Sequence, residues 1–208
     1  STSQIGEAGD DTMVAVSNAN LQWGGDGNDT MVGIGNLNIQ SGGTGDDLLL
    51  AAGQTNIQLG EDGKDKMFAV GSLNVQVGGD GEDLAVAVGS TNVQYGGNNA
   101  DILLAGGGAN IQIGGTGNDW LIGAGKGNVQ FGAELWSTIP DGVDLAGFDL
   151  DAAKAKLADY ENSQGTDGPN VMLAGGELNN KLGGSENDIT IGAAKDKRAD
   201  YANSTGSD

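Results

Sequence analysis

The sequence contains no cysteine and no histidine. It therefore has no thiol nucleophile, no Ser-His-Asp triad, no zinc finger and no haem ligand of the usual kind. Basic residues are also scarce, since 9 Lys and Arg stand against 29 Asp and Glu and give a net charge of −20. A charge of that sign opposes binding to nucleic acids and to anionic membranes. No apolar run approaches the roughly 18 residues of a membrane-spanning helix.

Aromatic residues make up only 4% of the 208 residues, whereas 40 residues are Gly. Such a composition is unusual for a domain that buries an ordinary globular core. Simple disorder is disfavoured as well, because 37% of the residues are hydrophobic. An internal repeat is therefore the first feature to look for.

A nonapeptide with the sequence GGDGNDTMV at residues 24–32 recurs every 18 residues in seven copies without an insertion. The copies occupy residues 6–14, 24–32, 42–50, 60–68, 78–86, 96–104 and 114–122. A second nonapeptide with a different ending, such as VGSTNVQY, alternates with the first. One unit of 18 residues therefore consists of an Asp-type half and an Asn-Gln-type half.

This alternation of Gly-rich turns and short apolar runs predicts a parallel β-solenoid, an all-β fold with coils of 18 residues. Successive coils lie about 4.8 Å apart, so residues 18 positions apart form columns along the solenoid. One edge then carries a column of Asp residues and the opposite edge a column of Asn residues. The Asp column consists of Asp11, Asp29, Asp47, Asp65, Asp83, Asp101 and Asp119. The Asn column consists of Asn20, Asn38, Asn56, Asn74, Asn92, Asn110 and Asn128.

The Asp column requires positive charge, because neighbouring carboxylates about 4.8 Å apart repel each other by roughly 3 kcal/mol at an effective dielectric near 20. Most of the repeats supply no Lys or Arg. Carboxylates and Gly-loop carbonyls are hard oxygen ligands, and these favour Ca²⁺. The seven Asp residues enclose six gaps, so we expect about six calcium ions. Neutral Asn amides can instead hydrogen-bond to the amides above and below them.

The nonapeptide resembles the GGxGxDxUx repeat of RTX (repeats-in-toxin) proteins, in which U is a large apolar residue. The resemblance covers residues 6–131 and returns weakly later in the chain. It implies a calcium-binding parallel β-roll in which Asp11, Asp29, Asp47, Asp65, Asp83, Asp101 and Asp119 are side-chain ligands. The alternation with GxxN halves is most similar to the C-terminal repeats of the large multifunctional autoprocessing RTX toxins.

The chain departs from the RTX pattern in several loops. Glu7 and Glu61 replace the second Gly, and Lys64 and Lys66 flank Asp65. We expect weaker binding in the gaps next to these Lys residues. Asn99 replaces the fourth-position Gly, which is compatible with the loop because Asn tolerates positive φ.

The sequence leaves open which side chains face the interior. The RTX register places Met13 and its equivalents inside, together with the Gln column that begins at Gln22. Simple alternation in the Asn-type half favours the reverse, with Ile39 and its equivalents inside. In either register one apolar face remains to be covered or to meet a partner.

The period breaks after residue 131, and the sequence predicts three further segments. Residues 132–164 form a helical insertion, with helical spacing over residues 150–160. Residues 165–191 resume the β-roll, and Asp188 falls in the ligand column and offers one further calcium site. Residues 192–208 repeat the 151–167 segment, with 11 of 17 positions identical, and start a second, truncated helical cassette. We therefore expect the natural protein to continue beyond residue 208.

We expect a calcium-binding RTX repeat module of a secreted bacterial toxin or adhesin, with no enzymatic activity. The resemblance implies type I secretion, a chain that is unfolded at low cytosolic calcium, and folding on extracellular Ca²⁺. Its partners are then calcium ions, the rest of the same polypeptide and an unidentified target on a host cell surface. An ice- or surface-binding adhesin segment is the alternative. Paired carboxylates near Trp120, Trp136 and Tyr160 keep a glycosidase-like enzyme as a third class.

Overall fold

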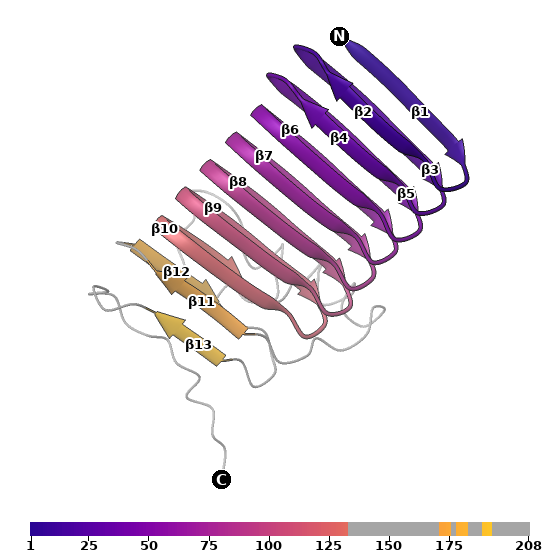
Figure 1. The fold of residues 1–208 in the computed structure, drawn as a ribbon. Coiled ribbons are helices and arrows are strands. Elements are labelled where there is room, and N and C mark those ends of the chain that lie inside the picture. Colours follow the sequence, from indigo (N-terminus) through magenta and orange to yellow (C-terminus); the bar gives the residue numbers. More distant parts are fainter. Residues whose placement is uncertain (133–170, 176–177, 183–188, 193–208) are drawn as a thin grey trace, which may run out of the picture.

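The computed structural model describes residues 1–132, 171–175, 178–182 and 189–192. These residues form an all-β parallel solenoid with coils of 18 residues, as predicted, and the described residues contain no helix. The coils lie side by side along one axis, from the N-terminus at one end to β13 at the other (Figure 1). The predicted helical insertion and second cassette lie outside the described residues, apart from their first residues, and stay predictions.

Two layers of parallel strands make up the solenoid. The first layer contains β2 (Thr12–Val16), β4 (Thr30–Ile34) and the N-terminal parts of the long strands. The second layer contains β1 (Thr2–Ala8), β3 (Ala19–Asp26), β5 (Leu37–Thr44) and the C-terminal parts of those strands. The long strands are β6 (Leu48–Asp62), β7 (Lys66–Asp80), β8 (Leu84–Asn98), β9 (Ile102–Thr116) and β10 (Trp120–Phe131).

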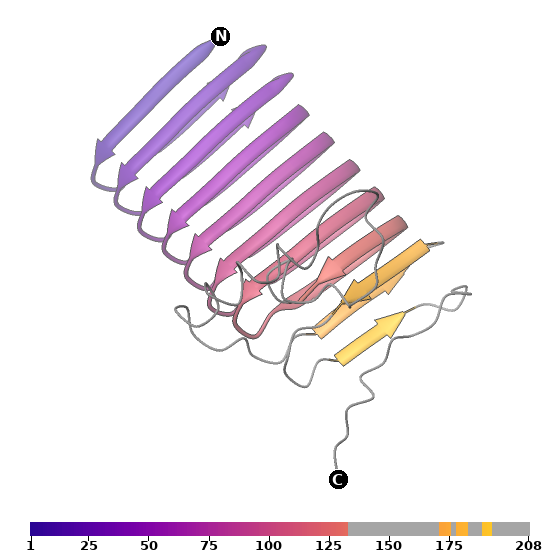
Figure 2. The same cartoon turned by 180° about the vertical axis from the view of Figure 1, so that it is seen from behind.

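Three short strands extend the stack at its C-terminal end. β11 (Val171–Gly175) pairs with the first part of β10, and β12 (Leu178–Leu182) pairs with the second part. β13 (Ile189–Gly192) pairs with β11. The rear view shows these strands continuing the stack past β10 (Figure 2). The chain therefore returns to the solenoid after residue 170.

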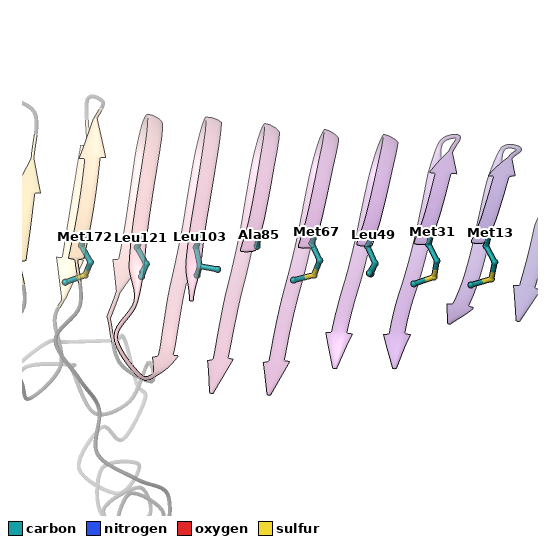
Figure 3. Close-up of a cluster of buried hydrophobic side chains, with 8 residues drawn as sticks. All are labelled: Met13, Met31, Leu49, Met67, Ala85, Leu103, Leu121 and Met172. Carbon is teal, nitrogen blue, oxygen red and sulfur yellow. The ribbon is translucent and has the colours of Figure 1, made fainter. Parts of the chain in front are cut away.

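The strand register follows the sequence period. Asn56 pairs with Asn74, and Asn74 pairs with Asn92, so identical residues lie directly above one another. The main apolar column runs through the interior beside a column of buried Ala residues, and Figure 3 shows its side chains pointing inward from the first layer. The main column consists of Met13, Met31, Leu49, Met67, Ala85, Leu103, Leu121 and Met172.

The second layer places Asn and Gln in the interior, so the RTX register is correct and simple alternation is wrong. Gln40 is fully buried, and its Nε2 donates to Gln22 Oε1 (2.9 Å) and to the carbonyl of Leu50 (3.1 Å). Because each amide bonds to the next coil and to the opposite layer, its burial leaves no donor unpaired. Ile39 consequently points outward.

Small residues in the first layer make room for the buried Asn side chains. A Cβ at Gly33 would lie 2.9 Å from Asn38 Oδ1, and the other coils carry Ala or Gly at this position. The interior is therefore thin, with one large apolar residue per coil between polar ladders. The edges of the solenoid must be held by hydrogen bonds or charge rather than by a thick core.

Candidate metal centre

The Asp residues lie at the end of six-residue loops that connect the second layer to the first. In the loop at residues 24–29, Gly25 and Gly27 have φ of 116° and 124°, a region that favours Gly. The same positions elsewhere hold Glu7 (82°), Glu61 (83°) and Asn99 (77°). Asn99 adopts positive φ as predicted. The loop shape is thus kept even where a side chain opposes it.

The structure brings the seven predicted Asp residues of the main column together on one inner edge. Six of them, Asp29 to Asp119, are at most 2% exposed, and Asp11 in the first coil is half-buried. Oδ1 of each buried Asp accepts the backbone N–H of the Asp one coil earlier, over 2.6–2.9 Å. Such bonds explain how a column of like charges keeps its register.

The second carboxylate oxygen of these residues is not satisfied by the protein. In six of them Oδ2 is buried and has no hydrogen-bond partner among the described residues. The six are Asp11, Asp29, Asp47, Asp65, Asp83 and Asp101. Asp119 occupies the same position in the last long coil, and its Oδ1 accepts the N–H of Asp101 at 2.9 Å. A buried oxygen without a partner is costly, so this row needs a cation or a proton.

The first Gly of each loop forms a close cradle for Oδ2, in which a Cβ has no room. A Cβ built at Gly42 would collide with Asp47 Oδ2 and would lie 2.7 Å from the carbonyl oxygen of Gly60. The same two kinds of oxygen converge at Gly60, from Asp65 and Gly78. Each cradle therefore presents one carboxylate oxygen from its own loop and one carbonyl oxygen from the next coil. These are the hard ligands that calcium takes.

Electrostatics within the column favour any bound positive charge. Burial, together with the charges of Asp119, Asp83 and Glu82, raises the pKa of Asp101 to about 8 despite the lowering effect of the hydrogen bond from the Asp83 N–H. Burial likewise raises the pKa of Asp65 to about 7. It raises the pKa values of Asp47 and Asp83 to about 6. Without a cation, part of this column holds protons near neutral pH.

The Asn edge contrasts with this arrangement. Asn74 Nδ2 donates to the carbonyl of Val88 (3.1 Å) and to Asn92 Oδ1 (2.8 Å), and Asn74 Oδ1 accepts from Asn56 (2.8 Å). The predicted hydrogen-bonded Asn ladder is therefore present. It has no need of an ion, because both amide groups have protein partners.

Lys64 and Lys66 lie beside the Asp column, as their positions predict. They line a hollow of about 340 Å³ together with Asp46, Glu82 and Asp65. Lys64 Nζ forms an exposed ion pair with Glu82 at 2.7 Å. Neither Lys residue hydrogen-bonds to a carboxylate of the Asp column in the described part of the chain. The Asp column thus has no side-chain counter-ion there.

Of the other residues that the sequence analysis singled out, the structure describes only Trp120. Asp188, Trp136 and Tyr160 lie outside the described residues, and Trp120 is 51% exposed on an outer face. Within residues 1–132 and the short described strands, no three acidic side chains form a group that could hold a metal. A cation in the Asp column would therefore need backbone carbonyls for much of its coordination.

Sequence reasoning missed two features of this edge. It did not foresee that Oδ1 would bond to the neighbouring Asp N–H, which only the stacked geometry brings within reach. Nor did it distinguish the first Gly of the repeat, which lacks positive φ, from the other loop glycines. That Gly is needed because a Cβ has no room. Its presence in all seven copies, where the second position varies, was the available signal.

Among the described residues there is no helix that could cross a membrane. Comparisons of the chain with protein-family models, with curated proteins and with solved structures each found no match.

Proposed function

We propose that the chain is a calcium-binding repeat module of the RTX type, from a secreted bacterial toxin or adhesin. The observation that carries the proposal is the row of buried Oδ2 atoms without hydrogen-bond partners, each beside a Gly carbonyl oxygen. The fold supports it, because a parallel solenoid with 18-residue coils is compatible with a β-roll.

The proposed ligands are the carboxylates of Asp11, Asp29, Asp47, Asp65, Asp83, Asp101 and Asp119, aided by loop carbonyls. Calcium fits this donor set better than zinc or copper, because the loops offer only hard oxygen atoms. It fits better than Mg²⁺, which demands small octahedral sites and retains its water. We expect about six ions in the gaps of the column, and one further ion near Asp188.

The bound ions would supply positive charge between the carboxylates. The chain's own residues do the remaining work: the Gly cradles hold Oδ2 beside a carbonyl oxygen, and the Oδ1 bonds fix each carboxylate in its coil. Loss of the ions would leave several buried carboxylates that repel one another. The free energy of calcium binding would then become free energy of folding.

Such coupling suits a protein that crosses membranes unfolded. At low cytosolic calcium the acidic chain would stay unfolded for type I secretion, and millimolar extracellular calcium would fold it. In this proposal the module is extracellular and structural rather than enzymatic, and the solenoid fold is of a kind that is typically structural.

The ice- or surface-binding alternative has less support. The third loop position mixes Asp26, Thr44, Asp62 and Asn98, so its surface is chemically irregular. Several of these side chains also bond to one another, as Thr44 Oγ1 does to Asp26 Oδ1 at 3.1 Å. Hydroxyl groups engaged in this way are less available to an external lattice.

Calcium titration monitored by far-UV circular dichroism and calorimetry tests the proposal. From EGTA into millimolar CaCl₂ we expect a cooperative gain of β-structure and heats that correspond to about six ions. MgCl₂ should produce neither. A chain that is folded in EGTA and gives no heat with calcium would contradict the proposal.

A pair of variants in one coil locates the binding. Asp65→Asn removes a proposed ligand that lies between two gaps, and it should lower the number of bound ions. Asp62→Asn removes an equal charge from an exposed loop position of the same coil and should leave that number unchanged. Equal losses in both variants would indicate a nonspecific charge effect rather than sites in the column.

A further inference from the structure

The outer face of the first layer is apolar and nearly free of charge. It is formed by the outward residues of β2 and β4 and of segments 48–52, 66–70, 84–88, 102–106 and 120–124. Lys66 is the one charged residue in these seven strand segments. Seven of its large apolar side chains are 44–70% exposed. We call this surface the first-layer face.

The exposed residues form columns rather than scattered points. Val70 (58% exposed) and Val88 (52%) are paired in register on neighbouring strands near the middle of the face. Val16 (70%) and Ile34 (47%) are paired in the same way at the N-terminal end. A contiguous exposed apolar surface that extends over seven strand segments is typical of an interaction site.

Within residues 1–132, the acidic residues are confined to the loop edge of the solenoid. Asp46, Asp62, Asp80 and Glu82, for example, all lie in or next to the six-residue loops, outside the first-layer strand segments. Despite the net charge of −20, a partner could therefore approach this face without meeting a carboxylate. An acidic or basic macromolecule would find nothing complementary there.

The dimensions of the face match those that a dimer needs. Seven strands of five residues cover about 34 Å by 17 Å, and two such faces packed together would bury roughly 1,100 Å², which just exceeds the minimum of ~1,000 Å² expected of a biological interface. A second copy also has the same strand spacing, so its side-chain columns can interdigitate along the whole face.

We infer that the first-layer face is a homodimer interface in which two copies pack face to face about a two-fold axis. An isologous arrangement of this kind uses one self-complementary patch and closes at two copies. Lys66 lies in the strand position next to the Asp loop, so it falls at the margin of the interface. The two Asp edges stay accessible at the rim.

Sedimentation velocity of the full chain in millimolar CaCl₂ tests this inference. The wild-type chain should sediment as a dimer at micromolar concentration. The double variant Val70→Lys, Val88→Lys should sediment as a monomer, because it buries two charges per copy in the interface. Ser72→Lys, Ser90→Lys is the matched control, since it adds the same charge to exposed positions at the Asn edge of the same coils. This control should remain a dimer.

Circular dichroism shows whether each variant keeps its β-structure, which we expect because all four positions are exposed. A second pair on the same face, Val16→Lys with Ile34→Lys, should also give monomers. A wild-type monomer, or a dimer that survives both face variants, would overturn the inference and leave the face to another occupant. The calcium proposal fails in calorimetry and this one in sedimentation, so the two failures are distinguishable.

Discussion

The two edges of the solenoid solve the same structural problem with different chemistry. Each edge must close a coil every 18 residues with a buried polar side chain. At the Asn edge the amide is both donor and acceptor, and Asn74 is satisfied by Asn56, Asn92 and Val88. At the Asp edge the carboxylate can only accept, so Oδ2 of the residues from Asp11 to Asp101 is left without a hydrogen-bond partner in the described part of the chain. One edge is complete in the polypeptide, and the other requires something from solution.

This difference makes the two edges respond differently to conditions. The Asn ladder should be indifferent to calcium and to pH near neutrality, because amides do not titrate there. The Asp column should depend on both. A calcium-responsive solenoid therefore needs ion sites along only one edge, while the other edge keeps the coils in register.

Placing an Asp side chain at the Asn edge should have the largest effect on stability. Asn74→Asp replaces Nδ2 with an acceptor that faces the Val88 carbonyl and Asn92 Oδ1. We expect it to lower the free energy of unfolding by about 3–5 kcal/mol at low and at saturating calcium, because it buries an uncompensated charge. Urea denaturation in two solutions, one with just enough CaCl₂ for folding and one with saturating CaCl₂, measures the change.

The reciprocal change, Asp65→Asn, is its control. The amide can keep the bond to the Asp47 N–H (2.8 Å) and can donate toward the Gly78 carbonyl, while it removes one charge from the column. It should therefore stabilise the calcium-free chain and destabilise the calcium-loaded chain. Equal destabilisation in both solutions would mean that the Asp column is not a cation site.

The next largest difference between the two edges is the pH dependence of stability that the Asp column gives the calcium-free chain. Asp47, Asp65, Asp83 and Asp101 have folded-state pKa values of about 6 to 8, above the usual 3.8. The folded state therefore binds more protons than the unfolded state between about pH 4 and 8, and its stability falls as pH rises through that window. Each titrating Asp contributes at most about 1.4 kcal/mol per pH unit.

Far-UV circular dichroism in EGTA from pH 8 to pH 5 checks this direction, because the calcium-free chain, unfolded near neutral pH, should gain β-structure as these carboxylates take up protons. In CaCl₂ the trend should reverse, because protons compete with calcium for the same oxygens. A calcium-free chain that loses stability on acidification from pH 8 to pH 5 would rule out the raised pKa values.

The Gly cradle gives a smaller effect confined to the Asp edge. In Gly60→Ala the new Cβ would collide with Asp65 Oδ2 and lie 2.7 Å from the Gly78 carbonyl oxygen. We expect a loss of about 2–3 kcal/mol and weaker calcium binding, because backbone and carboxylate must both shift. Gly106→Ala is the control, since its Cβ meets nothing within 4 Å. That substitution should be neutral or slightly stabilising.

The repeat period made much of this architecture predictable from the sequence. Spacing of 18 residues determined the columns, and the scarcity of basic residues in the repeats identified the Asp column as the unsatisfied one. The orientation of Gln40 and Ile39 was not decidable, because a polar residue is tolerated inside only when a stacked neighbour bonds to it. The division of labour between Oδ1 and Oδ2 of Asp47 likewise depends on a neighbour 18 residues away.

The outward residues of the strands also show why alternation could not decide which side chains face the interior. Alternation predicts that one face of each strand is polar and solvated, as in most antiparallel sheets. Here the outward residues of β8 include Leu84, Val86 and Val88, while the inner face of its second half carries Asn92 and Gln94. The usual inside-outside rule fails because ladders satisfy polar groups inside. Hydrophobic patterning alone therefore could not give the register.

The smallest predicted effect concerns the strained loop position of Glu61. Its φ of 83° lies in the left-handed region, which costs a non-Gly residue about 1–2 kcal/mol. Glu61 also accepts a hydrogen bond from Ser41 Oγ, and its charge helps to raise the pKa of Asp47. Glu61→Gly relieves the backbone and removes a like charge, but it loses the Ser41 bond and gains entropy in the unfolded chain. The net gain in unfolding free energy should be about 0.5–1 kcal/mol in the solution with just enough CaCl₂ for folding.

Asn99→Gly is the matched control for that change, because Asn99 has a similar φ of 77° but belongs to a residue type that tolerates it. Asn99→Gly should gain less unfolding free energy than Glu61→Gly, and both gains can be measured in one urea series. If Glu61→Gly instead lost stability in saturating CaCl₂ while gaining it in the solution with just enough CaCl₂ for folding, the Glu61 carboxylate would act with Asp47 in holding the cation. The strain at that loop would then be retained for binding, and the Asp edge would contain one site unlike its neighbours.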